Sequence, residues 1–351
     1  MLPLSTTPQT RSRYWDIVRG IGILSIVMGH CFSHAVIYVY TYHLAIFFFV
    51  SGFLYNEKRY GQDPFAHIGA KLKSSWPNYM LYMSLFVLLH NPFQIMGINA
   101  PAQHYTPSQT LAHLGNSLVF YGAEPMGGAL WFVPVWVLAC GIFGGIAWFS
   151  LRFSRPFLIL IPVSLMLSCV GAFLMFREVF LFYRVHLVFL VQPFFAAGWL
   201  LKTKLPQFRR FLAWYIALPC ALFLGFLVNA WQLHIDIAVG RIGNGWQFFF
   251  LAFLGIYCCM TLADLLDKID GLGRLFALWG RYSFDIMALH FLIFKLMDVS
   301  YGRLYHHPLE YYSAFPHAFG GILWPVYVLL GTTFPALLGY GLERLKKASL
   351  A

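Results

Sequence analysis

Charged residues are scarce in this sequence of 351 residues. Asp, Glu, Lys and Arg together make up 11% of it, whereas 60% of the residues are hydrophobic. In an average soluble domain about a quarter of the residues are charged, and a soluble fold could not cover so much apolar surface with so few of them. The scarcity of charge therefore excludes a soluble enzyme and a disordered chain, and it indicates an integral membrane protein.

Acidic residues are the rarer charged type. The chain has 13 of them against 24 Lys and Arg, which gives a net charge of +11. The basic residues lie between apolar runs and do not follow one face, as nucleic-acid binding would require, so membrane lipid is an expected partner and nucleic acid is not. The six cysteines lie mostly within apolar runs and include no CxxC pair. Neither a disulfide framework nor a metal site is expected.

Long apolar runs fill most of the chain. A helix rises about 1.5 Å per residue and needs roughly 20 apolar residues to cross a 30 Å hydrocarbon core. We predict an all-α polytopic fold, one membrane-embedded domain over residues 1–351 with about ten transmembrane helices. They are expected near residues 15–34, 42–56, 76–91, 129–150, 157–176, 185–201, 211–230, 246–263, 281–298 and 321–342. The first two contain no charged residue between Gly20 and Asn56, so a short hairpin is expected there.

The basic residues orient these spans. With ten spans, 19 of the 24 Lys and Arg fall on the side of the two chain ends. The opposite side receives Arg177, Arg184, Arg241 and Arg303, and Lys295 falls within the ninth span. Because positive residues are enriched in cytoplasmic loops, we predict that both termini are cytoplasmic and that the protein is a multi-pass protein of the cytoplasmic (inner) membrane.

The first span carries three titratable residues, which are costly in a membrane and indicate function. Eleven residues separate Arg19 from His30, so the two lie about 20° apart on one helix face, with His30 roughly 16 Å further along. Asp16 lies about 40° from His30 on the same face. On spacing alone, an interfacial ion pair between Asp16 and Arg19 with a packed histidine explains the pattern equally well.

Four sequence blocks extend this pattern. Asp16-Ile-Val-Arg19 and Gly29-His30 are followed by Phe47-Phe48-Phe49-Val50-Ser51-Gly52-Phe53, by Leu130-Trp131-Phe132 and by Gly280-Arg281-Tyr282-Ser283 with His290. In this order, the blocks resemble those of membrane acyltransferase family 3, particularly its fucose 4-O-acetylase-like branch. The resemblance covers nearly the whole chain.

The resemblance implies an enzyme that moves an acyl group, usually acetyl, from cytoplasmic acyl-CoA to a hydroxyl of a cell-envelope or exported carbohydrate, such as a lipid-linked glycan. It implies acetyl-CoA as donor substrate and no bound cofactor. His30 matches the catalytic histidine and suits a general base. Arg19, paired with Asp16, matches the arginine that would bind the anionic donor. Where the family has Arg-x-x-Arg, this chain has Lys71-Leu72-Lys73, and both lysines are predicted to attract the donor's phosphates as point charges.

Further residues are candidates for the acceptor side. His34, one helical turn above His30, and His43, across the hairpin, could line an acceptor path. So could Trp131 and Glu124, the one acid of the long connection 91–128, which lacks Lys and Arg and is expected outside. Each also fits a structural or surface role. Ser51 and Gly52 fit close helix packing.

The late block adds two motif residues, Ser283 and His290. His290, Lys295 and Asp298 fit a structural polar cluster. Met287 occupies a position where the family commonly has tyrosine.

Two alternatives stay open. Polytopic helices with buried charges also fit a transporter or permease, although the chain shows no inverted repeat. Within the family, the acyl group could differ from acetyl, and the acceptor could be something other than a sugar. Direct transfer and transfer through an acyl-histidine at His30 both fit the sequence.

Overall fold

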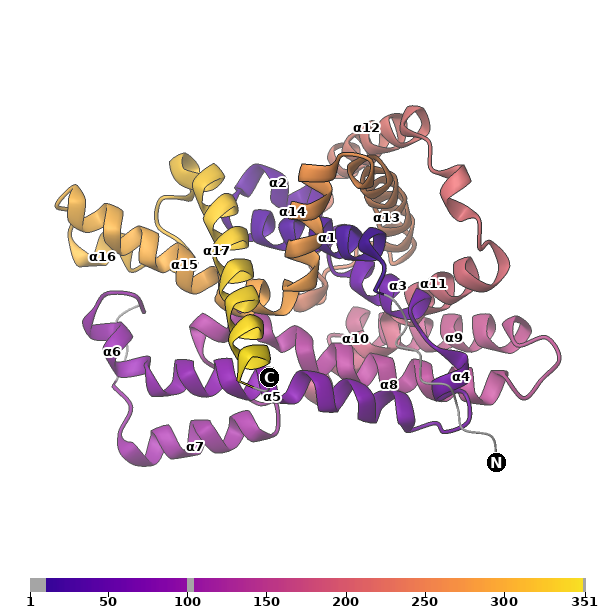
Figure 1. The fold of residues 1–351 in the computed structure, drawn as a ribbon, viewed down its shortest axis with the longest axis horizontal. Coiled ribbons are helices and arrows are strands. Elements are labelled where there is room, and N and C mark those ends of the chain that lie inside the picture. The colour runs from indigo at the N-terminus through magenta and orange to yellow at the C-terminus, as the bar shows by residue number, and fades with distance from the viewer. Residues whose placement is uncertain (1–10, 100–103, 350–351) are drawn as a thin grey trace.

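The computed structural model describes residues 11–99 and 104–349, and within them it contains helices and no strand (Figure 1). The all-helical prediction is therefore confirmed. The N-terminal half contains α1 (Arg13–Cys31), α2 (Ser33–Val39), α3 (Ala45–Phe53), α4 (Glu57–Tyr60), α5 (Ala66–Leu88), α6 (His90–Ile95), α7 (Pro107–Leu118), η1 (Pro125–Trp131), α8 (Phe132–Ser150) and α9 (Phe157–Phe176). The C-terminal half contains η2 (Phe182–Arg184), α10 (Val185–Leu190), α11 (Gln192–Lys204), η3 (Phe208–Phe211), α12 (Trp214–Ala230), η4 (Ile237–Val239), α13 (Trp246–Asp267), α14 (Asp270–Arg281), α15 (Ser283–Leu304), α16 (Leu309–Tyr312) and α17 (Gly320–Ala348).

Several of these helices can cross a membrane. By length and composition, four segments of the described residues qualify: Pro125–Ser150, Phe157–Phe176, Trp246–Asp267 and Leu323–Ala348. The helices on either side of Val191 form a fifth if the pair, bent by 45°, counts as one span. These segments indicate a multi-pass membrane protein, whereas the predicted number of ten spans is not confirmed.

The hairpin predicted between the first two spans differs from the structure. The helix of the first span ends at Cys31, because Phe32 adopts an extended backbone conformation, and a separate helix α2 follows. The second span predicted over 42–56 contains a shorter helix. Its helix, α3, has nine residues, which span about 14 Å and cannot cross a 30 Å core alone.

Helix α14 lies where only a charged cytoplasmic connection was expected. Its apolar residues Leu272, Leu275, Phe276 and Trp279 follow the spacing of one helix face, a signal that the flanking charges obscured. The helix packs along α1 (Figure 1). Gly20 faces the backbone carbonyl of Phe276, and Gly280 faces the backbone of Asp16, so a Cβ at either glycine would collide with main chain. This glycine pair brings the two backbones into direct contact.

A second glycine pair joins α3 to α11. Gly52 faces the backbone of Phe195, and Gly198 faces the carbonyl of Phe49. The neighbouring Ser51 donates a hydrogen bond to the Phe47 carbonyl at 2.7 Å and accepts one from the Trp136 indole at 2.9 Å. Small residues therefore fix the position of α3 at the centre of the helix bundle.

Helix α1 lies in the interior, in contact with α2, α3, α13, α14, α15 and α17. Ile17, Val18 and Val27 are fully buried. Because α14 ends beside the first turns of α1, the following α15 starts at that level, and its His290 reaches the ring of His30. The two helices thus run side by side in the same direction, and this pair builds the site.

Candidate active site

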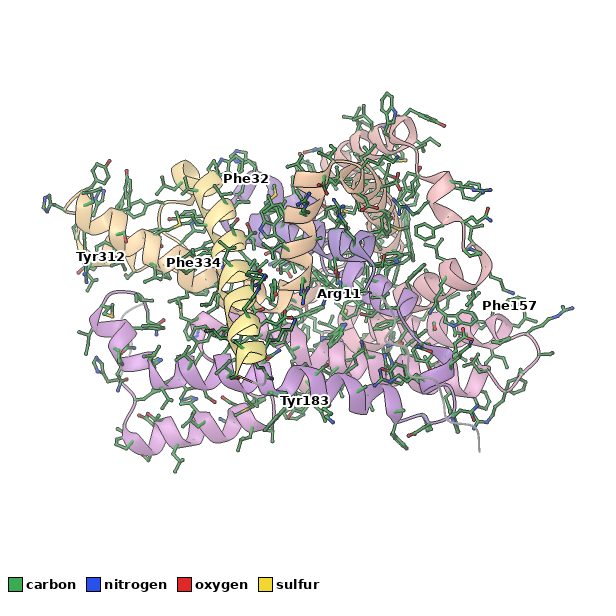
Figure 2. The ribbon with its side chains drawn as sticks, in the orientation of Figure 1. Arg11, Phe32, Phe157, Tyr183, Tyr312 and Phe334 are labelled. Atoms are coloured by element: carbon green, nitrogen blue, oxygen red, sulfur yellow. The ribbon has the colours of Figure 1, made fainter. Side chains whose placement is uncertain are left out.

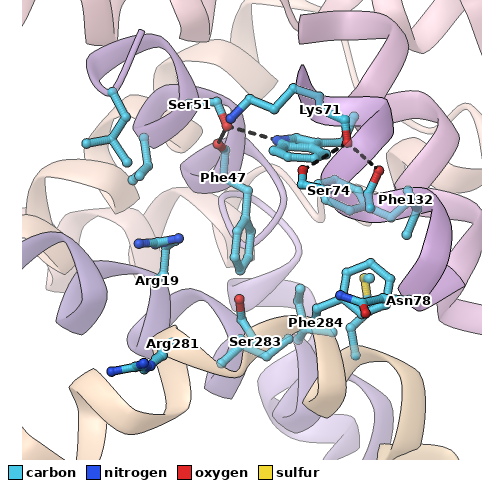
Figure 3. A pocket seen from close by; sticks show the side chains of 18 of the residues that line it. Arg19, Phe47, Ser51, Lys71, Ser74, Asn78, Phe132, Arg281, Ser283 and Phe284 are labelled. Carbon is cyan, nitrogen blue, oxygen red and sulfur yellow. Dashed lines mark hydrogen bonds between the residues drawn. The ribbon is translucent and has the colours of Figure 1, made fainter. Parts of the chain in front are cut away.

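Two adjoining cavities lie along α1 and α15. The larger one, about 450 Å³, begins at the N-terminal end of α1 (Figure 3). Its wall contains Arg11, Arg19, Ile23, Ile26, Phe47, Val50, Ser51, Leu54, Lys71, Ser74, Ser75, Asn78, Phe132, Val133, Trp136, Arg281, Ser283, Phe284 and Met287. The smaller cavity, about 120 Å³, is lined by Ile26, His30, Tyr40, His43, Leu44, Ala129, Trp131, Phe132, Asp236, Ala238 and Met287. Since Ile26, Phe132 and Met287 line both, the cavities meet at these three side chains.

Four cations line the larger cavity: Arg11, Arg19, Lys71 and Arg281. No acidic residue of the described chain lines it. In Figure 3, Arg19 and Arg281 lie on one side and Lys71 on the other, and Figure 2 shows Arg11 near the middle of the molecule. The excess of positive charge makes this cavity suited to an anionic ligand.

Asp16 holds two of these arginines. Its carboxylate accepts hydrogen bonds from Arg11 Nε at 2.6 Å and from Arg19 Nη2 at 2.5 Å. Asp16 itself is only 6% exposed and lies outside both cavities. Asp16, predicted as a catalytic residue, therefore fixes Arg19 near the N-terminal end of α1, whereas His30 lies near the C-terminal end of the same helix.

Lys71 and Lys73 have different positions on α5. Lys71 lines the larger cavity, and its Nζ lies 5.0 Å from the centre of the Trp136 ring. Ser74, Ser75 and Asn78 line the same wall. Their offsets of three, four and seven residues from Lys71 place them on its helix face, a periodicity that sequence reasoning missed. Lys73 is exposed and lies about 200° around the helix from that wall, so the structure does not bring it to the site.

Arg281 is a further residue whose role sequence reasoning missed, although it lies within the late sequence block. Its guanidinium pairs with Glu343 of α17 at 2.6 Å and lines the larger cavity beside Ser283. The helix break at Tyr282 separates it from α15. Arg281 and Arg19, which are 262 residues apart in sequence, therefore share one wall.

The smaller cavity contains His30. The His30 ring stacks on that of His290, with ring centres 5.2 Å apart and planes at 28°, and contacts Phe291 edge-on at 4.9 Å. His290 is fully buried. Its Nδ1 lies 2.9 Å from the Ile286 carbonyl, and its Nε2 has no hydrogen-bond partner among the described residues. His290 is thus in direct contact with the predicted catalytic histidine.

His43, a candidate for the acceptor side, also lines this cavity. Its Nδ1 lies 2.9 Å from the Val39 carbonyl, and a carbonyl only accepts hydrogen bonds, so this nitrogen carries the proton. Its Nε2 is then an acceptor. Tyr40, which sequence reasoning missed, lies between the two histidines, with ring centres 6.4 Å from His30 and 4.6 Å from His43.

Asp236 completes the smaller cavity's polar wall, and Arg184 contacts two of the residues that line this cavity, Trp131 and Ala238. Asp236 lines it and accepts a hydrogen bond from the Ala238 amide at 3.0 Å. Burial raises the pKa of this carboxyl group. The Arg184 guanidinium lies 4.5 Å from the centre of the Trp131 ring and donates to the Ala238 carbonyl. No motif marked either residue, because the loop holding Asp236 reaches the cavity only through tertiary packing.

His34 and Glu124 lie outside both cavities. His34 is exposed on α2, with its ring 5.6 Å from that of Phe32, because the helix break at Phe32 removes it from the face of His30. Glu124 is 3% exposed and its Oε2 lies 3.0 Å from His90 Nδ1. It forms a buried pair at the start of η1, whereas Trp131 at the end of η1 lines the cavity.

Lys295 and Asp298 form a separate cluster. Both are fully buried and paired at 3.1 Å. Lys295 also donates to the carbonyls of Tyr312 and Ala314, the second at 2.9 Å, and Asp298 accepts from the Tyr327 hydroxyl and from the Ala318 amide at 2.9 Å. These bonds fasten the connection before α17 to α15, which is a structural role.

A family model described as an acyltransferase domain matches residues 12–342. The chain belongs to this acyltransferase family. Neither a curated protein nor a solved structure matches it. The match supports an acyltransferase over the permease alternative and includes every residue of both cavities except Arg11. In this acyltransferase the His30 cavity and the basic cavity together form the candidate active site.

Proposed function

We propose that this acyltransferase moves a short acyl group, acetyl in the first place, from cytoplasmic acyl-CoA to a hydroxyl of a cell-envelope or exported carbohydrate. One observation carries the proposal: a basic cavity adjoins a histidine-containing cavity within the family's acyltransferase domain. We call the basic one the donor cavity and the other one the acceptor cavity.

The donor cavity suits the charged end of acyl-CoA. Phosphate groups form charge-assisted hydrogen bonds with guanidinium groups, often two at a time, and attract an ammonium group as a point charge. Arg11, Arg19, Arg281 and Lys71 supply these groups. With both termini in the cytoplasm, this cavity opens toward the cytoplasmic face, and the eleven residues from Arg19 to His30 reach about 16 Å outward.

Direct transfer at His30 accounts for the meeting of the cavities. The imidazole takes the proton of the acceptor hydroxyl, whose oxygen attacks the thioester carbonyl carbon. The new ester C–O bond forms, the C–S bond breaks, and the proton passes to the departing thiolate of coenzyme A. The two cavities meet next to His30, so the donor and the acceptor can be bound at the same time. An acyl-histidine intermediate is therefore not required.

The acceptor cavity supplies groups that suit a carbohydrate. The carboxylate of Asp236 and the unprotonated Nε2 of His43 can accept hydrogen bonds from hydroxyl groups. The Trp131 ring provides a flat apolar surface. A glycan, free or lipid-linked, would approach from the outer side of the membrane.

The test uses membrane vesicles from cells that express the chain, with radiolabelled acetyl-CoA outside and the cells' own glycans as acceptors. Inverted vesicles expose the cytoplasmic face, and we expect base-labile label on carbohydrate there and not in right-side-out vesicles. His30→Ala should lower transfer by at least about 100-fold, the contribution of a general base.

The matched control is His34→Ala, since His34 is exposed outside both cavities. It should retain wild-type transfer. Retained transfer in His30→Ala would contradict the proposed function. Equal labelling of right-side-out vesicles would contradict the cytoplasmic use of the donor and leave the role of His30 standing.

A further inference from the structure

Three side chains separate the donor cavity from the acceptor cavity. Ile26 of α1, Phe132 of α8 and Met287 of α15 each line both, and all are buried. Each comes from a different helix, and the boundary between the cavities lies among these side chains, so an acyl group that moves from one cavity to the other takes its passage between them. We call these three residues the collar.

We propose that the collar selects the acyl group by size, with Met287 as its movable member, so that acetyl passes and longer chains are rejected. The inference rests on the proposed function, because it assumes that the thioester reaches His30 from the donor cavity. It adds a specificity-determining residue that lies on the acyl path.

The order of residues along two helices places the collar on this path. On α1, Arg19 and Ile23 line the donor cavity, Ile26 lines both cavities, and His30 lines the acceptor cavity. These residues are spaced by four, three and four, which is one helix face. On α15, Ser283 lines the donor cavity, Met287 lines both, and the ring of His290 stacks on His30.

The volume beyond the collar limits the acyl chain. If the charged end of the donor stays with the arginines, the acyl group enters the collar with its methyl end first. It then occupies the acceptor cavity of about 120 Å³, which the attacking hydroxyl must enter too. Each added methylene therefore competes with the acceptor for the same space, whereas the bonds formed and broken in the transfer stay the same.

Met287 is the collar residue that can move. Its side chain is unbranched and has three rotatable bonds. Ile26 is β-branched and has one strongly preferred rotamer on a helix. The Phe132 ring packs against Phe48 at 5.3 Å and Phe47 at 6.0 Å between ring centres. The opening of the passage thus depends on the rotamer of Met287.

The experiment compares acetyl-CoA, butyryl-CoA and hexanoyl-CoA as radiolabelled donors in inverted vesicles containing the full chain and endogenous glycans. We expect the wild type to prefer acetyl. Met287→Ala should raise the kcat/KM for butyryl-CoA relative to that for acetyl-CoA about tenfold. This is the lower end of the discrimination that one methylene group produces in an apolar pocket. Met287→Phe should lower transfer of every acyl group while leaving the KM for acetyl-CoA near that of the wild type.

Met297→Ala is the matched control. Met297 lies on the same helix, lines a groove between α15 and α17 away from both cavities, and should leave the acyl preference unchanged. If Met287→Ala does not fold, Phe132→Leu tests the same passage and should shift the ratio in the same direction.

Three outcomes would contradict the proposed role of the collar. The wild type could prefer hexanoyl-CoA, the ratio of butyryl to acetyl kcat/KM could stay unchanged in folded Met287→Ala, or Met297→Ala could shift this ratio equally. Loss of transfer in His30→Ala together with an unchanged ratio in Met287→Ala contradicts the collar alone. Transfer retained in His30→Ala contradicts the proposed function instead.

Discussion

The donor and acceptor cavities are built from different parts of the chain. The polar groups of the donor cavity lie on helices or directly before one, as Arg19, Lys71 and Arg281 illustrate. The acceptor cavity combines helical His30 with Trp131 at the end of a 3₁₀ helix and Asp236 from a loop. A rigid cavity suits a donor that is the same in every reaction, and loops are the parts of a fold that vary most readily with the ligand.

The charges of the two cavities differ as well. Four cations line the donor cavity, and the one charged residue that lines the acceptor cavity among the described residues is Asp236. Under the proposed function, this difference in charge would keep an anionic donor on its own side of the collar and favour a hydroxyl-bearing acceptor on the other. Variants that affect one substrate and spare the other test this division.

Arg19→Ala should have the largest effect of these variants. Removing a charge-assisted contact to phosphate raises the KM for acetyl-CoA by about 10- to 100-fold, a loss of roughly 1.5–3 kcal/mol. Arg19→Lys should recover only part of it, because a point charge lacks the planar fork. Donor titrations of both variants give the measurement. An unchanged KM and turnover in Arg19→Ala would remove Arg19 from the donor cavity.

Asp236→Asn should act on the acceptor instead. The variant keeps the size of the side chain but loses its charge, and we expect the apparent KM for the glycan to rise about tenfold with the KM for acetyl-CoA unchanged. Because burial raises the pKa of Asp236, acceptor KM in the wild type should also rise as the pH falls through that pKa. Acceptor titrations over a pH series test both points, and a pH dependence retained by Asp236→Asn would assign it to another group.

Lys71→Ala and Lys73→Ala form the most closely matched pair of variants, and the effect expected from them is the smallest. Lys71 lines the donor cavity and Lys73 does not, so only the first variant should raise the KM for acetyl-CoA, by about three- to fivefold for one partly exposed charge. Salt should weaken the effect through screening. Equal increases in both variants would mean that general positive charge near the membrane attracts the donor.

The sequence predicted the donor side better than the acceptor side. Helix periodicity placed Arg19 and His30 on one face, and the structure places both along the two cavities, because a single helix fixes that relation locally. The same rule would have separated Lys71 from Lys73 and found Ser74, Ser75 and Asn78. The same periodicity does not extend to His34, because it holds only while the helix continues and α1 ends at Cys31.

Composition and periodicity by themselves determined the membrane class, the all-helical fold and the alignment of Arg19 with His30, since these depend on local apolar content and helix geometry. Tertiary structure alone decided that Arg281 shares a wall with Arg19, that Asp236 lines a cavity with Trp131, and that Met287 lies with Ile26 and Phe132 between the cavities. Those contacts join segments separated by up to 262 residues. Their positions follow from how helices pack, through small residues such as Gly20 and Gly280, and no local pattern encodes that packing.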